Sequence, residues 1–200
     1  MLQTAERFAT LTIPIALKLH VTPEQFVAIA AHNRDIRLER AATGELTVNP
    51  PTGGETGHRN SKLGLVLGIW WSNAGEPGLT FDSSTGFTLP NGAVFSPDAS
   101  WVSAERWESL TQQQRDTFPP ICPDFAIELR SKSDTLKPLQ TKMREYIING
   151  TRLGWLLDPQ NKTVEIYRAN GEVEILSNPA EASGEDVLPG FTLKLSRIWG

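Results

Sequence analysis

The pattern of hydrophobic and polar residues predicts a helix followed by a β-hairpin near the start of the chain. Pro23 follows Thr22 directly and Gln25 lies three positions after Thr22, a pattern typical of a capped helix N-terminus. Beyond this helix, hydrophobic and polar residues alternate on both sides of Gly44, which marks the expected hairpin turn. Residues 22–48 are therefore predicted to form an N-terminal helix and hairpin.

The middle of the chain predicts a loop, a buried helix and several short strands. Residues 50–60 are rich in Gly and Pro, as is typical of a loop. The hydrophobic residues of segment 61–75 are too dense for an exposed helix and indicate a helix that covers one face of a sheet. Turn sequences divide residues 78–102 into short strands, and residues 103–120 predict one or two short helices and then a loop.

The remaining segments predict a buried strand, a helix and further strands. Residues 125–129 form a hydrophobic strand, and the helix predicted over residues 135–150 ends at a glycine. Two more strands follow within residues 152–169, and the last thirty residues resemble edge strands. This order predicts a single α/β domain (mixed α+β) over residues 1–200, with layers of helix, sheet and helix.

Composition and charge exclude several classes of protein. The net charge of −4 argues against a protein that coats nucleic acid through phosphate contacts alone. The single cysteine, Cys122, excludes an internal disulfide, and His20, His32 and His58 match no zinc-site spacing. The sequence contains no membrane-length hydrophobic run and no recognisable signal peptide. We therefore expect a cytoplasmic protein with no membrane partner and no organic cofactor.

Charged residues interrupt the hydrophobic strand predicted at residues 125–129. Glu128 and Arg130 should share one face of this strand, where a buried carboxylate is costly unless it is paired or bound to a cation. One interpretation is an ion pair at a sheet edge between Glu128 and either Arg130 or a lysine. The other is a metal site, in which Asp98 from another strand-like segment and Lys142 from the following helix approach Glu128. Two carboxylates suit a hard cation such as Mg²⁺, and a lysine would offset charge that develops during phosphodiester hydrolysis.

The order of these residues resembles the PD-(D/E)xK restriction-endonuclease-like superfamily and, more closely, the Uma-type family of restriction endonucleases. The resemblance extends over "RLERAATGELTVNPPTGG", "LPNGAVFSPDASWV", "CPDFAIELRSKSDTLKPLQTKMREYIINGTRLGWLLDPQNKTVEIYR" and "VLPGFTL". It implies a central mixed β-sheet flanked by helices, with a catalytic core over residues 80–168. It also implies an endonuclease that uses Mg²⁺ (or Mn²⁺) to hydrolyse DNA and that acts as a homodimer.

The resemblance implies roles for individual residues as well. Asp98 and Glu128 would ligate the metal, together with the backbone carbonyl of Leu129. The family pattern includes a further acidic residue from the region of the first helix and strand. Glu39 is the first candidate for this residue, and Glu45 is the second because it lies beside the hairpin turn.

The chain departs from the superfamily pattern at Arg130, which stands where a lysine is expected. Arginine keeps the positive charge but titrates too high to exchange a proton with water. Lys142 is the candidate for a catalytic lysine that has moved to the next helix, with Arg130 as a further catalytic residue. Tyr146, one turn after Lys142, either lines the same site or simply packs in the core. The alternative function is a catalytically inactive nucleic-acid-binding or protein-interaction module on the same fold.

Overall fold

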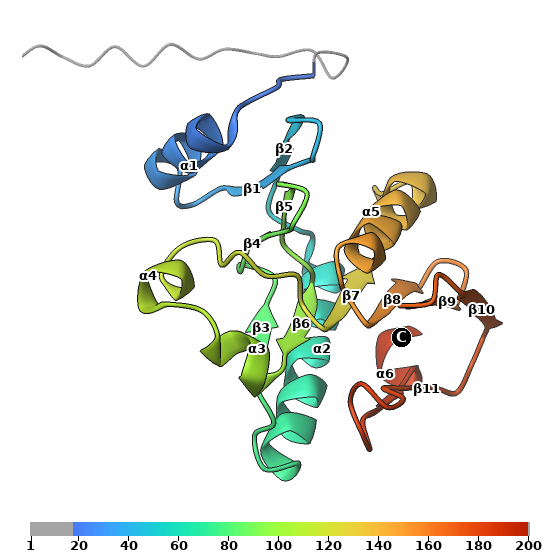
Figure 1. Ribbon diagram of the computed structural model, residues 1–200. Coiled ribbons are helices and arrows are strands. Elements are labelled where there is room, and N and C mark those ends of the chain that lie inside the picture. The colour runs from blue at the N-terminus through green and yellow to red at the C-terminus, as the bar shows by residue number, and fades with distance from the viewer. Residues whose placement is uncertain (1–17, 200) are drawn as a thin grey trace, which may run out of the picture.

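The computed structural model describes residues 18–199 (Figure 1). The first seventeen residues and Gly200, which belong to the predicted domain 1–200, lie outside the described residues. Within residues 18–199, none of the helices combines the length and the hydrophobicity that crossing a bilayer would require.

A mixed six-stranded sheet forms the centre of the fold, in the strand order β10-β9-β8-β7-β6-β3. Its strands are β3 (Leu79–Asp82), β6 (Ala99–Val102), β7 (Phe125–Leu129), β8 (Leu153–Asp158), β9 (Thr163–Arg168) and β10 (Val173–Ser177). Strands β7 and β8 pair in parallel and the other neighbours pair antiparallel. Every residue of β7 and β8 is buried, as expected for central strands covered on both faces.

Helices cover both faces of this sheet, which confirms the predicted fold class. Helix α2 (Gly54–Asn73) packs against β3 and β6, and α5 (Leu136–Ile148) packs against β7, β8 and β9. The core on the α2 side includes Leu67 and Trp155, and the core on the α5 side includes Met143 and Leu156. Because α5 connects the parallel strands β7 and β8, these three elements form one βαβ unit.

The predicted N-terminal helix and hairpin lie above the central sheet in Figure 1. Their elements are α1 (Pro23–His32), β1 (Arg37–Arg40) and β2 (Leu46–Asn49). The side chain of Thr22 accepts a hydrogen bond from the backbone nitrogen of Gln25, whose own side chain completes the capping box. Gly44 takes a φ of +92° at the hairpin turn, a conformation that residues with a side chain rarely adopt.

A second sheet joins this hairpin to the middle of the chain. It has the order β2-β1-β5-β4, where β4 is Phe87–Thr88 and β5 is Val94–Phe95. Strand β1 therefore pairs with both β2 and β5. This second sheet carries the start of the chain to the segment that leads directly into β6.

One prediction about secondary structure was wrong. Residues 54–60 belong to α2 and not to a loop, because side-chain contacts such as Arg59 Nε donating to the carbonyl of Ile198 (2.7 Å) compensate for poor helix-forming residues.

The edge strands predicted in the last thirty residues are β10, at the edge of the central sheet, and β12 (Thr192–Lys194). Strand β12 pairs with β11 (Glu181–Ser183) in a separate two-stranded sheet, followed by α6 (Ser196–Trp199). The predicted helices of residues 103–120 are α3 (Ala104–Glu108) and α4 (Gln112–Arg115).

Candidate metal and nucleic-acid site

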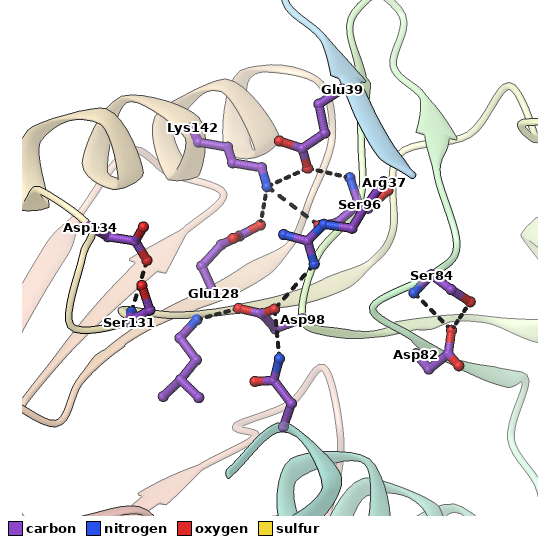
Figure 2. Close-up of polar contacts among 12 residues, drawn as sticks. Arg37, Glu39, Asp82, Ser84, Ser96, Asp98, Glu128, Ser131, Asp134 and Lys142 are labelled. Atoms are coloured by element: carbon purple, nitrogen blue, oxygen red, sulfur yellow. Dashed lines mark hydrogen bonds and ion pairs between the residues drawn. The ribbon is translucent and has the colours of Figure 1, made fainter. Parts of the chain in front are cut away.

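A groove of about 1580 Å³ lies between the β1–β2 hairpin, the N-terminal end of α2 and the segment from the end of β7 into α5. Four charged residues from separate parts of the chain line it and approach one another: Glu39, Asp98, Glu128 and Lys142. Figure 2 shows this cluster, in which each side chain comes from a different element or connection. The groove therefore has a charged centre built by the tertiary fold.

Pairing between β6 and β7 places Asp98 next to the strand that carries Glu128. The backbone nitrogen of Asp98, the residue before β6, donates to the carbonyl of Ile127 at 2.9 Å. In return, Oδ2 of Asp98 accepts a hydrogen bond from the backbone nitrogen of Leu129 at 2.8 Å. Asp98 is thus bonded to the residues on either side of Glu128, to Ile127 through its backbone and to Leu129 through its carboxylate, and both carboxylates are buried.

Lys142 projects from α5 onto two carboxylates. Its Nζ lies 2.8 Å from Oε1 of Glu128 and 2.8 Å from Oε1 of Glu39. The same ammonium lies 5.4 Å from the centre of the Phe95 ring and 5.8 Å from that of Tyr146, within range of cation–π attraction. The structure therefore brings the ammonium of Lys142 into contact with both Glu39 and Glu128.

Tyr146 packs in the core and contacts Glu128, but it is not among the residues that line the groove. Its ring is fully buried and packs edge-on against Phe95, with 5.7 Å between ring centres. Its hydroxyl donates to Oε1 of Glu128 at 3.1 Å. Glu128 thus receives a hydrogen bond from Tyr146 in addition to its ion pair with Lys142.

The surroundings shift the pKa values of the acidic residues in different directions. Burial raises the pKa of Glu128 to about 7, against the attraction of Lys142 and with the added repulsion of Asp98 and Glu39. Burial also raises the pKa of Asp98. Burial would raise the pKa of Glu39 as well, but Lys142 and the backbone nitrogen of Ser96 hold it below its ordinary value. Although burial disfavours its charge, the two glutamates raise the pKa of Lys142, which therefore remains an ammonium.

Sequence patterns missed two residues that contact Asp98. Asn60 Nδ2 donates to Oδ1 of Asp98 at 3.0 Å, and Arg37 Nη1 lies 3.6 Å from the same oxygen. The Oδ1 atom of Asn60 is buried and has no hydrogen-bond partner within the described chain. Asn60 belongs to a segment with the composition of a loop, and Arg37 occupies a polar position of the predicted hairpin. Neither sequence pattern indicates a functional site.

One family model matches most of the chain. The model described as "Uma2: Putative restriction endonuclease" matches residues 23–196, most of the chain. The chain belongs to the Uma2 family. The resemblance predicted from the sequence motifs is thereby confirmed.

A solved structure shares the fold of this Uma2 family chain. It is described as a crystal structure of "a putative nuclease belonging to DUF820" from Anabaena variabilis. The likeness covers 90% of this chain and 97% of the other, with a TM-score of 0.74 and 19% sequence identity. At this identity the match establishes the fold and leaves the activity to be argued from the site. A comparison with curated proteins finds no match.

Arg130 lies apart from this cluster in the Uma2 chain. Its Nη1 donates to Oδ2 of Asp158 at 2.7 Å, and its Nε donates to the carbonyl of Asp134 at 3.1 Å. Of the two ion pairs considered for Glu128, the one with Arg130 is therefore wrong, and the one with a lysine is confirmed, because Glu128 pairs with Lys142. Strand β7 ends at Leu129, and the guanidinium of the next residue turns to the carboxylate at the end of β8.

The two remaining predicted residues are placed as follows. Glu45 forms an exposed ion pair with Lys18, 2.8 Å apart, and Glu39 is the acidic residue that reaches Lys142. The backbone nitrogen of Leu129 is bonded to Asp98, whereas the metal contact expected of its carbonyl stays a prediction.

The residues of the cluster fit a hard divalent cation. Residues 18–199 contain no group of three or more His, Cys, Asp or Glu side chains arranged to hold a metal. Mg²⁺, however, is commonly held by one or two carboxylates, with water and substrate phosphates as the other ligands. Asp98 and Glu128 supply two carboxylates, and the side chain of Asn60 orients the first of them by donating to its Oδ1.

Proposed function

We propose that the protein is a metal-dependent nuclease that hydrolyses phosphodiester bonds of DNA, with Asp98 and Glu128 holding Mg²⁺ or Mn²⁺. The observation that carries the proposal is the meeting of these two buried carboxylates with the Lys142 ammonium in one open groove. When bound, the cation would polarise a phosphate oxygen and lower the pKa of a coordinated water. The ammonium of Lys142 offsets negative charge on the phosphate and, with its raised pKa, does not act as a proton carrier.

The walls of the groove support a nucleic-acid substrate. Four basic residues line the groove, where they can contact phosphates: Arg37, Arg59, Lys132 and Lys137. Acidic side chains line the same groove, so a bound divalent cation would make it more favourable to a polyanion. Since one site of this kind cuts one strand, we further propose that two copies act together as a homodimer on duplex DNA.

The second candidate is a nucleic-acid-binding or protein-interaction module without catalytic activity. It is favoured by Arg130, which replaces the expected lysine and lies outside the cluster. It is also favoured by the engagement of Lys142 with two carboxylates, which leaves the ammonium less free to contact a phosphate.

Cleavage assays distinguish the two candidates. Supercoiled plasmid, single-stranded DNA and RNA would be incubated with the purified protein in Mg²⁺, in Mn²⁺ and in EDTA. We expect cleavage of DNA only with a divalent cation, and a loss of about 100-fold or more in Asp98→Asn. Asp82→Asn is the matched control, because Asp82 is exposed and bonds Ser84 in a turn away from Lys142.

Equal activity of Asp98→Asn and the parent protein would refute the assignment of the metal site. An absence of cleavage under all conditions, combined with DNA binding in EDTA, would favour the inactive module.

A further inference from the structure

Protein oxygens surround the ammonium of Lys142. An ammonium has three N–H donors, and three oxygens surround this one. Two belong to Glu39 and Glu128, each at 2.8 Å, and the third is the carbonyl of Ser96 at 3.4 Å. Only 12% of the lysine side chain is exposed. Every donor of Lys142 is thus directed at a protein oxygen.

The two proposed metal ligands differ in how they are neutralised. Glu128 Oε1 is in direct contact with the ammonium of Lys142. Asp98 is held by Asn60 and by the backbone of Leu129, and the nearest cation paired with it is Arg37 at 3.6 Å. The lysine therefore contacts Glu128, which is one of the two carboxylates that a metal would need.

We propose that Lys142 serves as an internal cation of the metal-free site, and that a divalent cation binds by competing with it for Glu128. This inference rests on the proposed metal-dependent function. A divalent ion and an ammonium that share one carboxylate repel each other strongly in a buried site. Metal binding is therefore coupled to withdrawal of the ammonium from Glu128.

Glu39 is the positioning residue in this exchange. Its Oε1 accepts from Lys142 and also from the backbone nitrogen of Ser96 at 2.9 Å, so the carboxylate is oriented from the segment before β6. When Glu128 turns to a metal, Glu39 retains the ammonium beside the groove. Its acidic side chain thus acts through the lysine instead of joining the metal.

Calorimetric titration with Mn²⁺ at pH 8 tests the competition. Lys142→Met removes the internal cation, and we expect it to bind Mn²⁺ at least about tenfold more tightly than the parent while losing cleavage activity. Lys142→Arg keeps a positive charge and should show no gain in affinity. Glu39→Gln should weaken Mn²⁺ binding in the parent, where the lysine then rests on Glu128 alone, and change it much less in Lys142→Met.

The outcomes separate this inference from the proposed function. Mn²⁺ binding that is equal or weaker in Lys142→Met overturns the competition but leaves the metal site in place. Equal losses from Glu39→Gln in both backgrounds would show that Glu39 is itself a ligand and overturn its positioning role. No Mn²⁺ binding by the parent or any variant overturns both proposals. Lys142→Gln is a second neutral variant with the same expectation, and thermal melting checks that each protein is folded.

Discussion

Replacing Glu128 by Gln should stabilise the metal-free protein, and the gain should depend on pH. Glu128 is buried against Asp98 and Glu39, and its pKa lies at about 7 in the folded protein against an ordinary value of 4.5. Folding therefore favours the neutral carboxyl group. Gln has nearly the same shape and never ionises, so it keeps the neutral form at every pH.

The expected magnitude follows from the two pKa values. A folded pKa above the unfolded one gives stability that is complete below about pH 4.5 and is lost as the pH rises through 7. At about 1.4 kcal/mol per pH unit, the parent protein loses about 3 kcal/mol over this window. Over the same pH range, the free energy of unfolding of Glu128→Gln should therefore rise by about 3 kcal/mol relative to that of the parent.

Glu39→Gln is the matched control because the coupling between protonation of Glu39 and folding has the opposite sign. Lys142 holds the pKa of Glu39 below its ordinary value of 4.5, despite burial. The stability that the Glu39 carboxylate supplies is then present above pH 4.5 and is lost only as the pH falls through its folded pKa. Between pH 5 and 8, Glu39→Gln should stay less stable than the parent, and the difference should shrink as the pH rises because loss of the Glu39 charge also lowers the pKa of Glu128.

Urea denaturation in EDTA at several values between pH 5 and 8 measures both differences. EDTA excludes divalent cations, which would compete with protons at Glu128. A difference between Glu128→Gln and the parent that stays flat over this range would refute the reasoning. So would a difference that falls as the pH rises.

Three further predictions concern residues around the site. Arg130→Met should cost about 2 kcal/mol by removing the partner of Asp158, with little effect on Mn²⁺ affinity by calorimetry. Because the pKa of Asp158 is lowered, this cost should shrink as the pH falls below 3.8, and an unchanged cost would contradict the pairing. Tyr146→Phe should cost about 1 kcal/mol in urea denaturation through the lost hydroxyl donor to Glu128, and wild-type stability would refute that role. Gly78→Ala should cost about 3 kcal/mol or more, because Gly78 has a φ of +108° and a Cβ would overlap the last carbonyl oxygen of β6; a melting temperature equal to the parent's would exclude this strain.

Local patterns predicted the elements whose signals lie within a few residues. The capping box at Thr22 and Gln25 marked the start of α1, and Gly150, with a φ of +110°, marked the end of α5. The hydrophobic residues of β7 and β8 indicated buried central strands. In each case the determining interaction is local or comes from burial, so the sequence alone carries it.

Features that depend on distant contacts were not predictable in the same way. Asn60 reaches Asp98 across 38 positions of sequence, and this contact forms only because α2 begins earlier than its Gly-rich start suggests. The partner of Arg130 lies 28 positions away on β8, so strand alternation around Glu128 gave no hint of it. Lys142 was predicted to approach the site because it flanks the hydrophobic face of its helix, beside Met143, and the family resemblance then added its catalytic role.

The charged cluster draws on two separate sheets. Glu39 comes from the small sheet of the hairpin and reaches Lys142 over 103 positions, whereas Glu128 and Lys142 belong to the βαβ unit. Local unfolding of the hairpin would leave the larger sheet intact but deprive the lysine of one of its two anchors. The charged cluster is thus complete only when the hairpin is docked, so a chain with an undocked hairpin would keep the central sheet and still lack the contact between Glu39 and Lys142.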